Sequence, residues 1–369
     1  MLTANKLGIL PGTENAPLTI DAQYAVGFNW ARQPSLRFAQ DINKTFWFGV
    51  SVEASQTIFA SNGTPLAVGA ANGAVVPTGL SVNAANACNA GGLLNSTTSC
   101  SNNKFPDIIE KAALDPGWGH YEVLGIQRWF TDDVASVAAP FLLPAAAVSP
   151  GFQEKTYFGW GIGGSVLLPV IPKFLDLQGS VLTGQGLGRY GSSQLADVTI
   201  GPDGTLKPLT TTQVLLGLVA HPWAGLDVYG YAGQEQVKAN FWNQVGFAGA
   251  AGPGGYGNPA YLNGGCFQPN TAAGLIGSSG FNTPIAPSSC TANVERTQEL
   301  TVGFWQQLYK GDLGQVRVGA QYEFVRLQAF AGTGTPLTKV AGTAGPQPNA
   351  GLNPYNNAVF FSLRYYPFN

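Results

Sequence analysis

The chain has 369 residues, of which only 10 % are charged, and its formal net charge is −2. Ordinary soluble domains contain about 25 % charged residues, so this composition argues against a soluble monomer. It also argues against nucleic acid as a partner, because no basic run is present to neutralise phosphates.

Twelve segments alternate apolar and polar residues, as strands with one apolar and one polar face do. Within 315–324, for example, Val316, Val318 and Ala320 share one face, and Arg317 and Glu323 share the other. In chain order, the predicted strands are 18–31, 35–41, 45–57, 105–114, 118–131, 153–168, 174–187, 209–220, 225–237, 296–309, 314–330 and 355–368.

The connections between these strands alternate between short and long from residue 41 onward. In an up-and-down barrel every other connection lies on the same rim, and barrels of the outer-membrane type have short turns on the periplasmic rim and long loops outside. No run of 18 apolar residues is present, so a spanning helix is not expected. The pattern predicts one antiparallel transmembrane β-barrel over 1–369, with both chain ends on the periplasmic side and extracellular loops at 58–104, 132–152, 188–207, 238–294 and 331–353.

Three stretches resemble known outer-membrane proteins. The final segment 359–368 is amphipathic and rich in aromatics, like the last strand of Gram-negative outer-membrane proteins. The stretches 17–34 and 106–120 resemble trimeric porins of the DcaP-like group. The resemblance implies a homotrimer in the bacterial outer membrane, in contact with lipid and lipopolysaccharide. It also implies that the twelve strands form the C-terminal part of a barrel of roughly sixteen.

Charged residues on the polar strand faces are predicted to line an aqueous lumen, since an Arg or Lys facing lipid costs about 2–4 kcal/mol at the bilayer midplane. They form either a solvated wall without selectivity or, at Arg317 and Arg364 on adjacent strands, part of an anion-favouring constriction. The resemblance to these porins also implies that a segment folded into the lumen narrows it, and the candidates are 1–17 and 58–104. The predicted pore-lining residues are Arg37, Asp41, Glu53, Lys111, Glu122, Arg128, Lys155, Asp176, Asp227, Glu299, Arg317, Glu323 and Arg364.

The four cysteines fall into two local pairs, Cys88 with Cys100 and Cys266 with Cys290. Both pairs lie in loop-like stretches rich in Asn, Gly and Ser, without the spacing of a metal site. Two loop-stapling disulfides in an oxidising compartment are therefore expected, although the crossed pairing stays open.

The two histidines, His120 and His221, lie near short turns, and no serine is evidently paired with either. Neither an enzyme nor a cofactor is therefore expected. The sequence predicts a porin for passive diffusion of small hydrophilic solutes or ions. The alternative is a non-conducting structural or adhesive barrel whose long loops bind a partner.

Overall fold

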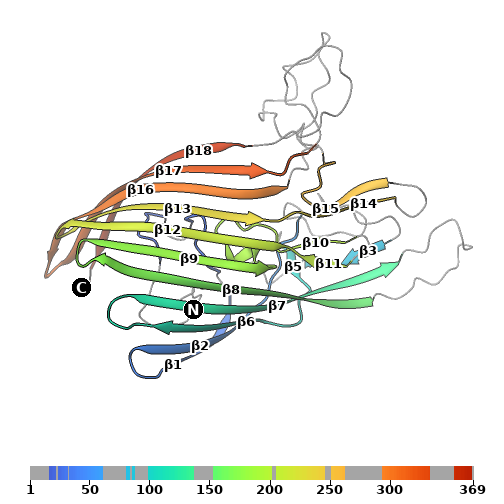
Figure 1. Ribbon diagram of the computed structural model, residues 1–369, viewed down its shortest axis with the longest axis horizontal. Coiled ribbons are helices and arrows are strands. Elements are labelled where there is room, and N and C mark those ends of the chain that lie inside the picture. The colour runs from blue at the N-terminus through green and yellow to red at the C-terminus, as the bar shows by residue number, and fades with distance from the viewer. Residues whose placement is uncertain are drawn as a thin grey trace, which may run out of the picture.

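The computed structural model describes residues 16–21, 24–31, 33–60, 80–83, 85–87, 99–136, 153–201, 205–245, 251–261, 293–332 and 353–367. Its main feature is a curved antiparallel sheet in which eleven strands follow one another and β3 (Leu80–Asn83) pairs with β7 off this path (Figure 1). In spatial order these are β1 (Ser35–Asp41), β2 (Phe46–Glu53), β6 (Asp107–Leu114), β7 (His120–Ser136), β8 (Gln153–Ile171), β9 (Leu175–Gln185), β12 (Thr210–Trp223), β13 (Leu226–Val237), β16 (Val294–Gly311), β17 (Gly314–Ala329) and β18 (Tyr355–Tyr366).

The predicted alternation places bulky apolar side chains on the convex face of the sheet. Side chains on this face are about half exposed, although they are aliphatic: Val123, Ile162, Leu216, Leu218, Leu300 and Val302. The opposite face buries charged groups, as at Lys111, Arg128 and Glu235. A soluble sheet would bury its aliphatic face and expose its charged one, so the wall is inverted as a membrane barrel requires.

The connections are sorted by length between the two ends of the sheet. In Figure 1 the tight turns lie at the left, such as 224–225 between β12 and β13 and 312–313 between β16 and β17. The long connections lie at the right, where β10 (Val198–Ile200) pairs with β11 (Leu206–Pro208) and β14 (Asn240–Val245) with β15 (Ala251–Tyr256). The remaining short strands, β4 (Ala85–Ala87) and β5 (Ser99–Ser101), pair with each other. This arrangement confirms the predicted up-and-down order of the wall.

The prediction of a strand over 18–31 is wrong. The chain turns twice there, with Tyr24 N–H donating to Asp21 O and Phe28 N–H to Ala25 O, and it then crosses the concave face. Val26 and Phe28 are buried inside the sheet, whereas Tyr24 is 63 % exposed, so the apolar spacing here does not mark one face of a strand. Among the described residues the path of the wall begins with β1 and has eleven strands, so β1 and β18 start from the same rim.

The first and last wall strands each have one partner within the described residues: β1 pairs with β2, and β18 pairs with β17. The sheet is therefore open along these two edges. Phe38 on β1 and Phe361 on β18 are both largely exposed, at 62 % and 82 %.

Among the described residues, no helix is long and apolar enough to cross a membrane.

Substituting an arginine on the convex face tests whether lipid or water covers that face. Val302, near the middle of β16, is 48 % exposed and faces outward. We expect Val302→Arg to lower the free energy of unfolding in lipid bilayers by about 2–4 kcal/mol, because the guanidinium meets hydrocarbon. The matched control is Leu313→Arg in the exposed β16–β17 turn, which should cost about 0–1 kcal/mol at the interface. Equal, near-zero losses in both variants would show that water bathes this face.

Candidate functional site

Two segments of the same chain lie on the concave side of the wall and contact it. We call the described residues of 16–33 the strap and those of 186–209 the inner loop. The strap, in blue, crosses behind β12 and β13 in Figure 1. The inner loop contains the short helix η1 (Gly188–Tyr190) and contacts the strap through the bridge between Asn29 and Gly191.

The first part of the strap is hydrogen-bonded to side chains of four wall strands. Leu18 N–H donates to Tyr231 Oη (3.0 Å), and Trp305 Nε1 donates to Leu18 O (2.8 Å). Ile20 N–H donates to Gln321 Oε1 (2.6 Å), and Arg364 Nη2 donates to Ile20 O (2.7 Å). These bonds replace the strand partners that the backbone of this segment lacks, which explains how an irregular segment can be buried here.

An apolar cluster holds the middle of the strap against the wall. Ala25 and Phe28 are buried against Leu215 and Val219 of β12, and the aromatic rings of Tyr229, Tyr231 and Trp305 complete the cluster. Fully burying a Val, Leu or Phe side chain contributes about 1.5–3 kcal/mol. The docked strap is therefore a folded part of the protein interior.

Two glycines permit the closest approach between the strap and the wall. Gly27 has a φ of +85°, and a Cβ there would lie 2.0 Å from the carbonyl oxygen of Val214. Gly233 faces it from β13, and a Cβ on Gly233 would lie 1.7 Å from Val26 O. Any larger residue at either position is incompatible with the docked strap.

Glu235 of β13 fixes both inner segments to the wall at one point. Its carboxylate accepts hydrogen bonds from the backbone amides of Gly27 (2.8 Å), Ser192 (2.8 Å) and Ser193 (3.0 Å). The side chain is fully buried. Charge-assisted bonds to backbone amides are among the stronger hydrogen bonds, so this residue acts as the common anchor of the strap and the inner loop.

Arg128 of β7 is the centre of a fully buried ion-pair cluster. Its Nε lies 3.1 Å from Asp107 Oδ2 on β6, and its Nη1 lies 2.8 Å from Asp197 Oδ1 in the inner loop. Nη1 also donates to Gly186 O, and Nη2 donates to Gln56 O. The guanidinium therefore joins the wall, the inner loop and the segment after β2.

Two inner-loop side chains complete the Arg128 cluster. Burial raises the pKa of Tyr190 well above its usual value, so its hydroxyl keeps its proton and donates to Asp107 Oδ2 at 2.8 Å. Burial also raises the pKa of Asp197, against the opposing effect of Arg128 and of amides from Ile58 and Arg189.

Both histidines lie at the short-turn rim, each between two carboxylates. His120 Nδ1 lies 2.5 Å from Asp115 Oδ1, and its Nε2 lies 2.8 Å from Glu122 Oε1. His221 Nδ1 lies 2.8 Å from Asp227 Oδ1, and its Nε2 lies 3.2 Å from Asp176 Oδ2. His221 of β12 thus joins β9 and β13, whereas His120 contacts its own strand and the turn before it.

Ser165 of β8 bonds to Glu122, the same carboxylate that contacts His120. Ser165 Oγ donates to Glu122 Oε2 at 2.5 Å, and Glu122 is also ion-paired with Lys111. The hydroxyl thus donates to a carboxylate, and this bond joins β8 to β7.

The two arginines singled out in the sequence face each other across β17 and β18, where Arg317 is paired in register with Arg364. Arg317 is ion-paired with Asp227, and its Cζ lies 5.7 Å from the centre of the Trp305 ring. Arg364 stacks more closely on Trp305, at 4.3 Å. Both residues are half-buried and lie near the short-turn end of the interior.

The remaining predicted pore-lining residues occupy different environments. Glu53, Lys111 and Arg128 are at most 1 % exposed, and Glu122, Glu299 and Glu323 at most 8 %. Arg37, Lys155, Asp176 and Asp227 are half-buried, and Asp41 is exposed beside the β1–β2 turn. With the strap and inner loop docked, the first group is packed against protein. Whether they line an open lumen stays a prediction.

Sequence reasoning missed Glu235, Asp107, Asp197 and Gln321, which hold the inner segments. It also assigned 188–207 to an extracellular loop, whereas Tyr190, Asp197 and Val198 of that stretch are buried within the sheet. The signal in the sequence was the cluster of apolar residues Leu195, Ala196, Val198 and Ile200 around Asp197, which is unusual for an exposed loop.

The cysteine predictions fall mostly outside the described residues. Cys88, Cys266 and Cys290 are not described, and Cys100 is described only as part of β5. The disulfides therefore stay a prediction.

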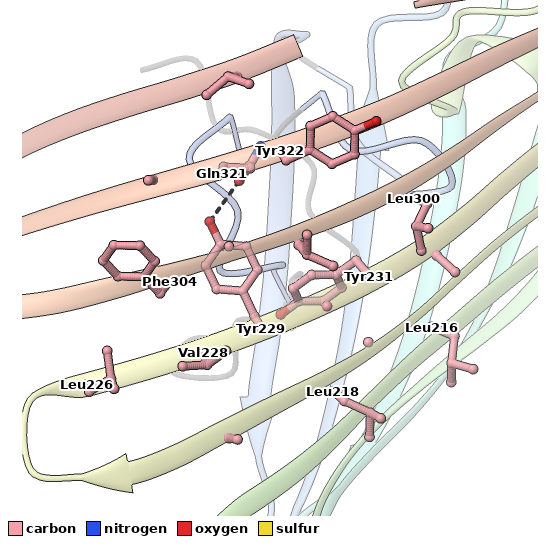
Figure 2. A pocket seen from close by; sticks show the side chains of 18 of the residues that line it. Leu216, Leu218, Leu226, Val228, Tyr229, Tyr231, Leu300, Phe304, Gln321 and Tyr322 are labelled. Carbon is pink, nitrogen blue, oxygen red and sulfur yellow. Dashed lines mark hydrogen bonds between the residues drawn. The ribbon is translucent and has the colours of Figure 1, made fainter. Parts of the chain in front are cut away.

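The convex face of the wall has a hollow of about 1080 Å³ over β12, β13, β16 and β17 (Figure 2). It forms where Gly230 and Ala232 of β13 lie between the larger Leu216, Leu300 and Phe304. At its base Tyr229 donates to Gln321 Oε1 at 2.8 Å. The lining is almost entirely apolar, so this hollow suits hydrocarbon and is not a path for hydrophilic solutes.

Comparison with solved structures finds the outer membrane channel DcaP of Acinetobacter baumannii, with a TM-score of 0.50 and 12 % sequence identity over 97 % of this chain and 70 % of that chain. The toluene transporter TbuX of Ralstonia pickettii matches with a TM-score of 0.30 and 11 % identity over 90 % of this chain and 81 % of that chain. No protein-family model matches the sequence, and no curated protein matches it significantly. The likeness to DcaP confirms the predicted fold, an antiparallel β-barrel of the outer-membrane type.

Proposed function

We propose that this protein is a channel of the bacterial outer membrane that lets small hydrophilic solutes or ions diffuse through its interior. The observation that carries the proposal is the inverted wall: aliphatic side chains cover the convex face, and charged side chains lie on the concave face. A barrel wall with this polarity faces lipid on its outer side and water on its inner side. DcaP, a channel of the outer membrane, shares the fold.

The docked strap and inner loop define the closed state of this channel. Their contacts bury the charged groups of the wall, so solutes pass only when the strap leaves its site. Release of the strap exposes Glu299, Glu323, Gln321 and Arg364, which all bond to it or lie beside it in the docked state. These groups then line the aqueous path.

Assembly and location are part of the same proposal. The resemblance to DcaP-like porins supports a homotrimer in contact with lipid and lipopolysaccharide, and no enzymatic activity is proposed. Arg317 and Arg364 supply cations to the path, whereas Glu299 and Glu323 supply anions, so a strong preference for either ion is not proposed.

Planar-bilayer recordings of the full-length protein test the channel. We expect discrete conductance steps, and proteoliposomes containing the protein should swell in an isotonic solution of a small sugar. The competing proposal, a non-conducting structural barrel, is favoured by one observation, the presence of the strap and the inner loop inside the wall. The absence of steps, both in the wild type and in a variant whose strap cannot dock, would support that alternative.

A further inference from the structure

The strap brings a third carboxylate next to two that belong to the wall. Asp21 of the strap, Glu299 of β16 and Glu323 of β17 each place a carboxylate oxygen within 4.8 Å of the others. Glu299 and Glu323 are largely buried. Like charges at this separation in a poorly hydrated site repel strongly, and carboxyl groups that share such a site cannot all be ionised.

Neutral donors satisfy part of this cluster. Gln321 Nε2 donates to Asp21 Oδ1 at 3.0 Å and also to Glu323 Oε1. Glu299 accepts from Val26 N–H at 2.9 Å and from Thr301 Oγ1. These bonds orient the carboxylates without changing their total charge.

The basic groups nearby are engaged elsewhere. Arg364 donates to Ile20 O and stacks on Trp305, and Arg317 is ion-paired with Asp227. Within the described part of the chain, no Lys, Arg or His forms an ion pair with Asp21, Glu299 or Glu323. Among the described residues, Tyr229 and Tyr231 of β13 also face this part of the strap. Glu235 of the same strand accepts from Gly27 farther along the strap.

Docking of the strap therefore changes the number of charges that the site must hold. With the strap released, Asp21 leaves and the wall pair is exposed to water, where both carboxylates can ionise. With the strap docked, three carboxyl groups share the site, and holding a proton relieves their repulsion. The docked state binds more protons than the released state, so a lower pH favours docking.

We propose that the strap is an acid-stabilised plug: protonation of the cluster formed by Asp21, Glu299 and Glu323 favours the closed channel, and ionisation at higher pH releases the strap. The inference rests on the proposed function and names how the same interior is regulated. For one proton taken up on docking, the ratio of docked to released strap changes by at most about tenfold for each unit of pH.

Two measurements on the full-length protein test this plug. Conductance in planar bilayers reports opening, and hydrogen–deuterium exchange of the peptide covering 16–31, corrected for the intrinsic rate at each pH, reports docking. Between about pH 5 and about pH 8, which bracket the titration of crowded carboxyl groups, we expect conductance to rise and strap protection to fall by about tenfold or more. Unchanged or opposite trends in strap protection overturn the proposal.

Glu323→Gln is the decisive variant, because it removes one charge and keeps the shape of the side chain. We expect the strap to stay protected over more of this pH range, with lower conductance and a weaker pH response than the wild type, because only Asp21 and Glu299 still share the site. Asp312→Asn, in the exposed β16–β17 turn, is the matched control and should respond like the wild type. If Glu323→Gln keeps the full pH response, the cluster is not the switch and the proposal is wrong.

The histidines at the short-turn rim offer a different origin for pH dependence, since His221 contacts two carboxylates. His221→Gln should keep the wild-type pH response of strap protection; loss of the response in this variant alone assigns the switch to the rim and overturns the proposal. Suppose that strap protection depends on pH through Glu323 but the protein never conducts. This result would support acid-stabilised docking and reject the channel. Conductance without a pH-dependent change in strap protection would support the channel and reject acid-stabilised docking.

Discussion

Replacing Gly233 by Val should open the channel. A Cβ on Gly233 would lie 1.7 Å from the carbonyl oxygen of Val26, and this obstacle is backbone, which cannot rotate away. The strap must then leave the wall near Gly27, and its bond to Glu235 and the packing of Phe28 are lost with it. We expect a severalfold rise in conductance in planar bilayers, together with faster hydrogen exchange over 16–31.

Gly230→Val is the matched control for this variant. Gly230 lies three residues away on the same strand and faces outward, and its added Cβ would have Val302 Cγ1 as its nearest neighbour, at 3.8 Å. This variant should conduct and exchange like the wild type. If Gly233→Val folds, releases the strap and still conducts like the wild type, then the strap does not obstruct the path and the closed state lies elsewhere.

The opened variant should also lose stability. Val26 and Phe28 are each 5 % exposed in the docked state, and full burial of one such side chain contributes about 1.5–3 kcal/mol. Part of this contribution disappears when the strap is released, since the interior of the open barrel is wet. A rise in conductance without any fall in the free energy of unfolding would indicate that the strap finds another buried site.

The wall could be predicted from the sequence because each strand has one face toward lipid and the other toward the interior of the barrel. A residue such as Val302 faces hydrocarbon while its neighbour Thr301 faces the interior, and this contrast recurs every second residue. Tight turns at 224–225 and 312–313 then fix which strands are neighbours. Local pattern and local connectivity are sufficient for this part of the fold, so the order of the wall strands was predicted correctly.

The interior could not be predicted in the same way. Contacts that hold it join distant parts of the chain, such as Val26 with Glu299 and Arg128 with Asp197. The strap alternates apolar residues like a strand, because an irregular segment packed between a wall and an inner loop also needs an apolar side. What distinguishes it is Gly27, whose positive φ suits a turn, but a single glycine does not separate a turn from a bulge.

Removing the charge of Arg128 should have the largest effect on stability. Its side chain and those of Asp107 and Asp197 are 0 % exposed, so Arg128→Met leaves two buried carboxylates without their cation. Deleting one partner of a buried pair costs about 3–5 kcal/mol, whereas an exposed pair such as Lys104 with Glu154 contributes about 0–1 kcal/mol. The free energy of unfolding in lipid bilayers should fall by the larger amount for Arg128→Met and by the smaller amount for Lys104→Met.

A second substitution separates the lost charge from lost packing. Adding Asp197→Asn to Arg128→Met removes one of the unpaired carboxylates, so the double variant should recover part of the stability although it has lost more of the original contacts. Lowering the pH should also reduce the deficit of Arg128→Met, because protonation neutralises the carboxylates that the arginine no longer pairs. If the double variant is less stable than the single one at every pH, the cluster stabilises the protein through hydrogen-bond geometry and packing. In that case charge compensation is not the reason why the inner loop stays inside the barrel.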